Sequence, residues 1–190
     1  MGGVVDKLRN SGQLSNTYIM FTSDNGYHHG EHRIPSSKAR PYEEDVNMPL
    51  LVRGSGVAPG STTAKLALNT DYFPTFTDLA GVYTPSYVDG RSLLPILKGN
   101  ATTWQSAILL EAHHTRYAGS TPSYYGIRSN EGRKYVEYNS GERELYNLGT
   151  DPYELRSSYK AATPPSGLAT RLKALKACAG ASCRSAENGR

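Results

Sequence analysis

The chain has 190 residues, of which 37% are hydrophobic and 20% are charged, so it holds enough apolar side chains for the core of a globular domain. The formal net charge is +4, but the lysines and arginines are scattered without a long basic run, and we expect no nucleic-acid partner. No apolar stretch reaches the roughly 18 residues of a membrane-spanning helix, so we expect no membrane partner. The first residues also lack the continuous apolar segment of a signal peptide.

The N-terminal stretch predicts one helix and two short strands. Val4 and Leu8 fall on one face of a helix over residues 3–11. The runs 18–21 and 50–52 are apolar on both faces, which is typical of parallel strands buried in a sheet. Two such strands alone would leave unpaired edges, so either another polypeptide completes this sheet or the fold is truncated.

Two oxygen-bearing side chains, Asp24 and Asn25, follow the first predicted strand at its carboxyl end. Ligands bind at this edge in open α/β sheets. A carboxylate beside an amide carbonyl suits a hard cation such as Ca²⁺, which takes only oxygen ligands. The alternative is a simple turn, because Asp24, Asn25 and Gly26 all belong to residue types that favour turns.

Three histidines follow this turn. His28 and His32 are four residues apart, which on a helix would suit zinc, but Gly26 and Gly30 argue against a helix. We interpret His28 as a candidate catalytic residue of a substrate pocket and His32 as a structural, hydrogen-bonding histidine. His29 is expected to face solvent.

The middle of the chain predicts a short strand over residues 65–68 and then a helix that one of residues 69–71 caps. Phe73 and Phe76 mark its apolar face, which we expect to pack in the core, and Gly81 ends it.

The last third alternates apolar and polar residues with a period of two, which indicates antiparallel strands joined by glycine-containing turns. A helix over residues 166–177 would cover one face of this sheet. Its tyrosines are expected to pack within half-buried strands, although a stacking surface is an alternative. His113 and His114 directly follow the first of these strands, beside Arg116 and Tyr117, and are expected in a polar loop. The predicted strands cover residues 107–111, 124–128, 134–138 and 144–148.

Cys178 and Cys183 lie close enough in sequence to close a short disulfide, which would fit an exported protein. Reduced thiols are the alternative, and two cysteines without a nearby histidine do not favour a metal site. The conflict between an export-type disulfide and the lack of a signal peptide suggests that an upstream part carries the signal.

The segment over residues 22–54, TSDNGYHHGEHRIPSSKARPYEEDVNMPLLVRG, resembles the carboxyl-terminal half of the sulfatases, which are members of the alkaline-phosphatase-like superfamily. The resemblance continues through the motifs DYFPT, DLAG, DGRSLLP, ELYNL and DPYEL. It implies that Asp24 and Asn25 are two ligands of a single Ca²⁺ and that Lys38 contacts the sulfate group. Lys38 and Lys65 are the only lysines between Asp24 and Thr70, so few residues compete for this role.

The resemblance also implies the fold class, which is α/β. Residues 1–100 would form the C-terminal part of the sulfatase α/β domain, a partial alkaline-phosphatase-like sheet with helices. Residues 101–190 would form a small antiparallel α+β subdomain closed by a C-terminal helix. The resemblance further implies that the edge carrying His113 and His114 can border the substrate cleft. The full-length relative is expected to be extracellular or periplasmic.

Similar sulfatases use a formylglycine nucleophile made from a Cys/Ser-x-Pro-x-Arg motif, which this sequence lacks. Cys178 and Cys183 are followed by Gly180 and Ser185 where that motif requires proline. We therefore expect the chain to hydrolyse aryl or carbohydrate sulfate esters only together with a nucleophile-bearing N-terminal half. A non-catalytic gene remnant or a metal- and anion-binding module is the first alternative. A phosphodiesterase or phosphonate hydrolase of the same superfamily is the second, although the Asp-Asn pair favours a sulfatase.

Overall fold

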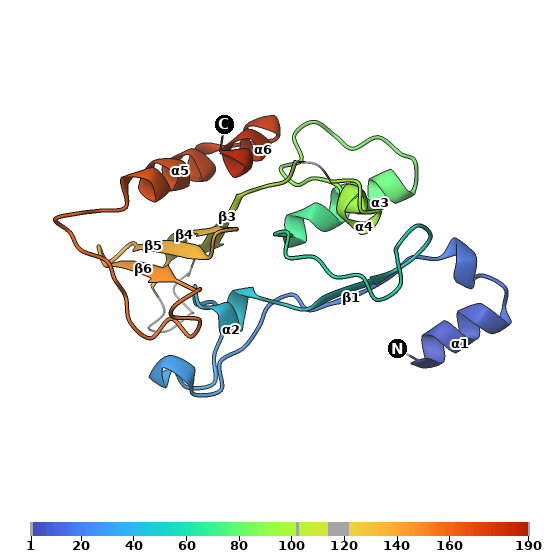
Figure 1. Cartoon of the computed structure of the whole chain (residues 1–190), viewed down its shortest axis with the longest axis horizontal. Coiled ribbons are helices and arrows are strands. Elements are labelled where there is room, and N and C mark those ends of the chain that lie inside the picture. The colour runs from blue at the N-terminus through green and yellow to red at the C-terminus, as the bar shows by residue number, and fades with distance from the viewer. Residues whose placement is uncertain (1, 102, 114–121, 190) are drawn as a thin grey trace.

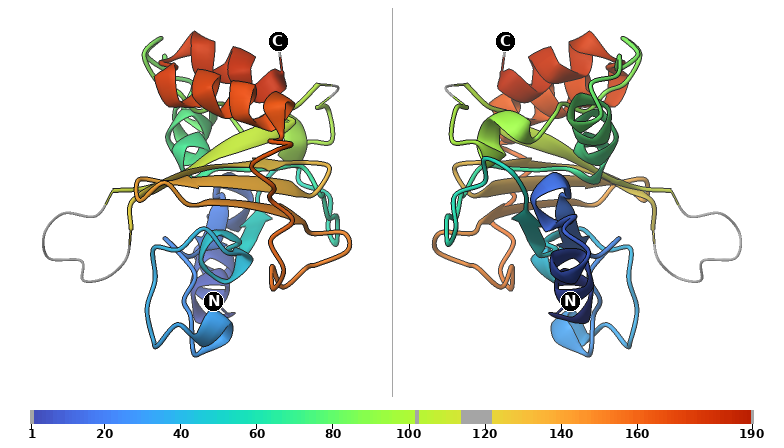
Figure 2. Two further views of the ribbon diagram at one scale, coloured as in Figure 1. Left: turned by 90° about the vertical axis from the view of Figure 1, so that its left-hand side faces the viewer. Right: turned by 90° about the vertical axis from the view of Figure 1, so that its right-hand side faces the viewer.

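A four-stranded antiparallel sheet lies at the centre of the structure, a computed structural model that describes residues 2–101, 103–113 and 122–189. Two C-terminal helices cover one face of this sheet, and segments of the N-terminal half lie against the other face (Figure 1; Figure 2). The architecture is α/β, with small antiparallel sheets and helices, as the sequence predicted.

The four predicted strands of the last third are confirmed. They pair with their sequence neighbours in the order β3-β4-β5-β6, each pair antiparallel. Gly132 adopts a left-handed conformation, with φ of +75°, in the turn between the second and third of these strands. Glycine adopts this conformation without the steric penalty that a side chain would bring. The strands are β3 Ala107–Ala112, β4 Tyr124–Ser129, β5 Arg133–Tyr138 and β6 Arg143–Asn147.

The helix α5, Ser166–Ala177, covers one face of the sheet, as predicted from its leucine spacing. Leu172 and Leu175 pack against a row of inward residues that includes Ile127. The opposite face is also covered, because Val46, Leu66 and other residues of the N-terminal half pack on it. The sheet is therefore buried on both sides, and its tyrosines pack in the interior, as expected. Those that are at least nine-tenths buried are Tyr124, Tyr135, Tyr138 and Tyr146.

The C-terminal cysteines form a disulfide, Cys178–Cys183, in agreement with the short-bridge interpretation. The sequence analysis missed the helix that follows, α6, Ala181–Asn188. Its residues are mostly small or polar, so no apolar period marks it. An ion pair of 2.6 Å between Arg91 and Glu187 attaches it to the rest of the chain.

Replacing both cysteines with serine should lower the free energy of unfolding by about 2 kcal/mol, because a bridge this short removes only a small loop from the unfolded ensemble. Urea unfolding of the variant and the parent chain measures the difference. The parent chain in reducing buffer is the matched control, and it should lose a similar amount. An unchanged unfolding midpoint in both would contradict the prediction.

The N-terminal helix is confirmed as α1, Gly2–Asn10, but the predicted parallel pairing of the next two strands is wrong. β1, Ile19–Thr22, and β2, Leu50–Arg53, pair antiparallel in a separate two-stranded sheet. A parallel pair needs a crossover connection, usually a helix. The segment between these strands instead contains only the four-residue helix α2, Glu43–Val46, and the short 3-10 turn Glu31–Arg33 among its described residues.

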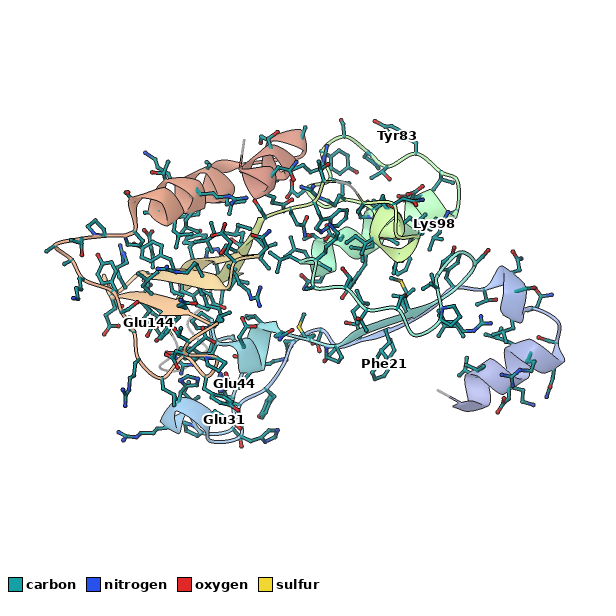
Figure 3. The ribbon with its side chains drawn as sticks, viewed as in Figure 1. Phe21, Glu31, Glu44, Tyr83, Lys98 and Glu144 are labelled. Atoms are coloured by element: carbon teal, nitrogen blue, oxygen red, sulfur yellow. A yellow bond between two sulfur atoms is a disulfide. The ribbon has the colours of Figure 1, made fainter. Side chains whose placement is uncertain are left out.

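These two strands are also not buried on both faces. Phe21 is 47% exposed and Leu51 is 55% exposed. Figure 3 shows the Phe21 side chain pointing away from the rest of the chain. One face of this small sheet therefore has no cover within the described residues.

Two further expectations for the middle of the chain are wrong. Residues 65–68 form no strand; Leu66 and Leu68 instead pack against one face of the large sheet. Helix α3, Tyr72–Leu79, exposes about half of Phe73 and Phe76 and buries Pro74, Thr75 and Thr77 instead. The predicted helix stop is correct, since Gly81 has φ of +66°.

Three other short helical segments lie in the described part of the chain. The 3-10 turn Asn69–Asp71 precedes α3, and the Asp71 carboxylate accepts a 2.9 Å hydrogen bond from the Leu68 N–H at its start. The 3-10 turn Leu14–Asn16 follows α1, and α4, Leu94–Leu97, packs close to α3. The helices in the described part of the chain are all too short or too polar to cross a membrane.

Candidate functional site

The loop after β1 brings two of the predicted site residues into direct contact. Lys38 Nζ donates a 3.0 Å hydrogen bond to Asn25 Oδ1, and Asn25 Nδ2 donates to the carbonyl of Gly26 at 2.7 Å. Asp24 and Lys38 are exposed. The ammonium and the amide oxygen therefore meet in the loop that follows β1, and the exposed Asp24 carboxylate precedes Asn25 directly in sequence.

Helix α2 holds the start of this loop. Its Asp45 carbonyl accepts a 2.8 Å hydrogen bond from the Gly26 N–H, and its Glu44 carbonyl accepts a 3.0 Å bond from the Tyr27 N–H. The two segments lie so close that a Cβ on Gly26 would stand 1.8 Å from the Glu44 oxygen. Only glycine fits this position, and the close approach fixes the backbone next to Asn25.

A backbone bridge returns Lys38 to the start of the loop. The His28 N–H donates to the Ser37 carbonyl at 2.8 Å, and the Ser37 N–H donates back at 3.4 Å. This pairing places the next residue, Lys38, beside the turn that carries Asn25. Ala39 has φ of +70°, a left-handed conformation that is uncommon for a residue other than glycine.

His28 is fully buried, and its imidazole Nε2 lies 3.6 Å from Asp45 Oδ2. Its ring is edge-on to the rings of His32 and Tyr42. Burial raises the pKa of the Asp45 carboxyl, and a hydrogen bond from the Arg40 N–H opposes this shift. His28 is therefore enclosed, unlike Asp24 and Lys38, and its catalytic role stays a prediction.

The other histidines lie in different surroundings. His32 stacks on Tyr42, with ring centroids 3.9 Å apart, and its Nε2 lies 3.5 Å from Glu44 Oε2. The stacking fits a structural role, but His32 Nε2 has no hydrogen-bond partner among the described residues, so the hydrogen bond expected of it is not seen. His29 is exposed, as expected. His113 is exposed at the end of β3, near Glu111, and His114 lies outside the described residues.

Tyr42 connects this loop to the large sheet. Its hydroxyl donates to Glu144 Oε1 at 3.2 Å, and the Tyr138 hydroxyl donates to the other carboxylate oxygen at 3.0 Å. Figure 3 shows Glu144 and Glu44 on the same side of the molecule, where the loop meets the sheet. Burial, together with the Glu144 charge, raises the pKa of Tyr42 to about 12, so it remains a neutral donor at physiological pH.

The donor chemistry of Asp24 and Asn25 fits a hard cation, since both offer oxygen atoms. They cannot complete a site alone, because Ca²⁺ takes about six to eight oxygen ligands. The part of the chain that the structure describes contains no group of three His, Cys, Asp or Glu side chains arranged to hold a metal.

A family model for the C-terminal region of N-sulphoglucosamine sulphohydrolase matches residues 30–176, which include Lys38 and helix α2. The chain belongs to the sulfatase family. This sulfatase chain is 35% identical to N-acetylglucosamine-6-sulfatase of Bos taurus over 95% of its own length and 38% of that protein.

Solved structures agree with this assignment. The sulfatase chain superposes with a TM-score of 0.86 and 29% identity on BT4656, which was solved with its substrate D-glucosamine-2-N,6-O-disulfate. It superposes with a TM-score of 0.80 and 28% identity on the phosphonate monoester hydrolase of Agrobacterium radiobacter. The alignments cover 100% and 93% of this chain, but only 39% and 38% of those proteins. The fold is that of the alkaline-phosphatase-like superfamily, and the chain spans about two-fifths of the length of these relatives.

Sequence reasoning missed the importance of helix α2 and of the charged residues that hold it. Its residues Glu43, Glu44 and Asp45 look like an ordinary solvated acidic run in the sequence. A partial signal was present in β5, where Lys134 is in phase with the apolar Val136 and must therefore point to the same face.

Proposed function

We propose that this chain is the C-terminal part of a sulfuric ester hydrolase and that it supplies Asp24 and Asn25 to a Ca²⁺ ion and Lys38 to the sulfate group. The contact between Lys38 Nζ and Asn25 Oδ1 carries this proposal, because it places a cationic donor beside one proposed oxygen ligand, whose neighbour in sequence is the other. The family membership supports the same assignment.

Each residue has a separate chemical task in this proposal. The bound Ca²⁺ would supply positive charge that polarises the sulfate ester. Lys38 would donate to a sulfuryl oxygen and stabilise the charge that accumulates as the ester bond breaks. Because Asp24 and Lys38 are exposed, they can reach a ligand without a rearrangement of the core.

The nucleophile would come from an N-terminal region that completes the active site. The uncovered apolar side chains Phe21 and Leu51 support this idea, since they offer a surface for a further layer of the α/β domain. The disulfide Cys178–Cys183 supports an extracellular or otherwise exported location. We call this chain together with that proposed region the assembled enzyme.

We propose a sulfated amino sugar as the substrate class, because the bovine relative is an N-acetylglucosamine-6-sulfatase and BT4656 was solved with a glucosamine disulfate. The assembled enzyme should hydrolyse a glucosamine sulfate faster than an aryl sulfate or a phosphonate monoester. Preferred hydrolysis of the phosphonate would favour the second alternative instead, to which the Agrobacterium structure is similar. Binding of calcium or sulfate without turnover of any ester would favour a binding module.

Asn25→Ala should weaken calcium binding by the assembled enzyme, because it removes one of the two oxygen ligands that this chain is proposed to supply. We expect at least an approximately tenfold rise in the calcium dissociation constant by isothermal titration. Asn47→Ala is the matched control, since Asn47 is an exposed asparagine of the same segment at the end of α2. An unchanged calcium titration for Asn25→Ala would remove this residue from the ligand set.

A further inference from the structure

A buried lysine, Lys134, lies at the centre of an ion-pair network that has no direct part in the proposed reaction. Its Nζ lies 2.7 Å from Glu154 Oε1 and 2.9 Å from Glu43 Oε1, and it donates to the Pro41 carbonyl at 2.8 Å. The side chains of Lys134 and Glu154 are both fully buried. The ammonium therefore joins the sheet to two loop segments that are distant in sequence.

A second cation, Arg128, also contacts Glu43. Arg128 and Lys134 are directly opposite each other on β4 and β5, so they lie on the same face of the sheet. Like charges in this arrangement repel unless an anion lies between them. Arg128 donates from Nε at 2.9 Å and from Nη2 at 3.2 Å to the two oxygens of Glu43. Glu43 is thus the anion that both cations share.

The ionisation of Glu43 agrees with this geometry. Burial raises the pKa of its carboxyl, but the hydrogen bonds from Arg128 and the charge of Lys134 outweigh burial and hold the pKa below its usual value. The carboxylate is therefore charged at neutral pH, and it can hold both cations.

Glu43 is also the first residue of α2, and its backbone is held as firmly as its side chain. The Glu43 N–H donates to Glu154 Oε2 at 2.7 Å. The next two residues of α2 carry the carbonyls that accept from Gly26 and Tyr27, directly after Asn25. A continuous set of hydrogen bonds therefore runs from the sheet through α2 to the candidate site.

We propose that Glu43, held by Lys134, Arg128 and Glu154, is a positioning residue for Asn25 and for its contact with Lys38. It acts through the backbone of α2 and does not touch the substrate. This inference rests on the proposed function, because the position of Asn25 matters to catalysis only if Asn25 and Lys38 bind the cation and the sulfate.

Glu43→Gln tests the proposal, because it keeps the size of the side chain and removes the charge that both cations need. We expect amide hydrogen exchange at Gly26 and Tyr27 in the 190-residue chain to accelerate by about tenfold or more. The side-chain NH₂ signals of Asn25 should shift in the same NMR spectra. Exchange at the interior amides of β4 serves as the reference for global stability.

Glu187→Gln is the matched control, since Glu187 is another largely buried carboxylate, which lies in α6 and pairs with Arg91 at 2.6 Å. It should lower stability without a selective acceleration at Gly26 and Tyr27. Equal effects of the two variants at these amides, or unchanged exchange in Glu43→Gln, would overturn the positioning role.

Arg128→Lys keeps the test decisive if Glu43→Gln does not fold. It preserves the charge but loses the two-pronged contact with Glu43. We expect an acceleration at Gly26 and Tyr27 of about threefold, and no change would overturn the proposal. A lack of sulfatase activity in the wild-type assembled enzyme would overturn the proposed function alone, since the exchange measurements need no substrate and still decide the positioning role.

Discussion

Replacing Lys38 with alanine is expected to lower the turnover number for a glucosamine sulfate by about 100- to 1,000-fold in the assembled enzyme, the loss typical of removing one donor from a preorganised anion site. Lys38 is exposed and contacts Asn25 at 3.0 Å, so the truncation removes a cation without opening a cavity in the core. The melting temperature should therefore change little. Steady-state kinetics and thermal unfolding of the same preparation measure the two effects.

Lys65→Ala provides the matched control for this prediction. Lys65 is the other lysine between Asp24 and Thr70, and it is exposed as well. Its neighbour Leu66 packs against the large sheet, and Lys65 is not part of the loop over residues 24–38 that carries the candidate site. Its turnover number should stay at the wild-type value. If Lys38→Ala retained the same turnover as Lys65→Ala, Lys38 would have no role at the sulfate group.

The sequence predicted those parts of the fold whose packing partners lie within the chain. The alternation in β3 to β6 and the leucine spacing of α5 both record contacts that the chain makes with itself. Ile127 of β4 and Leu172 of α5, for example, are fully buried in the same core cluster. In such cases the period of the apolar residues and the buried face coincide.

The predictions failed where apolar residues have no partner among the described residues. Phe73 and Phe76 have the spacing of a buried helix face, yet each is about half exposed. Phe21 and Leu51 suggested a doubly covered parallel sheet, yet their strands pair antiparallel with one face open. The apolar period alone cannot tell whether the covering layer belongs to the same chain.

The candidate site could be predicted only in part, for a similar reason. The closeness of Asn25 to Lys38 follows from a local bridge between residues 28 and 37, and the family motif implied it. The supporting network instead joins Pro41 to Lys134 across 93 positions and Glu43 to Glu154 across 111 positions. No periodicity within one segment encodes contacts of that separation.

Lys134→Met is expected to lower the free energy of unfolding by about 3–5 kcal/mol at neutral pH, because it leaves two carboxylates of the interior without their shared cation. Methionine fills a similar volume, so the loss would come from charge and not from a cavity. Lys176→Met is the matched control: Lys176 lies 3.6 Å from Glu137 in a partly exposed pair, which should be worth less than about 1 kcal/mol. Chemical denaturation of both variants gives the comparison.

The pH dependence of this loss separates charge from packing. Burial raises the pKa of the Glu154 carboxyl, and the Lys134 ammonium opposes that shift, so the variant should raise this pKa further. A carboxyl whose pKa is higher in the folded chain binds more protons when folded than when unfolded. The protonated Glu154 carboxyl therefore does not destabilise the folded chain at low pH. It destabilises the folded chain once it ionises, as pH rises through the raised pKa. The deficit of Lys134→Met relative to wild type should accordingly shrink between about pH 7 and about pH 5. A deficit that stays constant over this range would mean that lost packing, and not an unpaired buried charge, destabilises the variant.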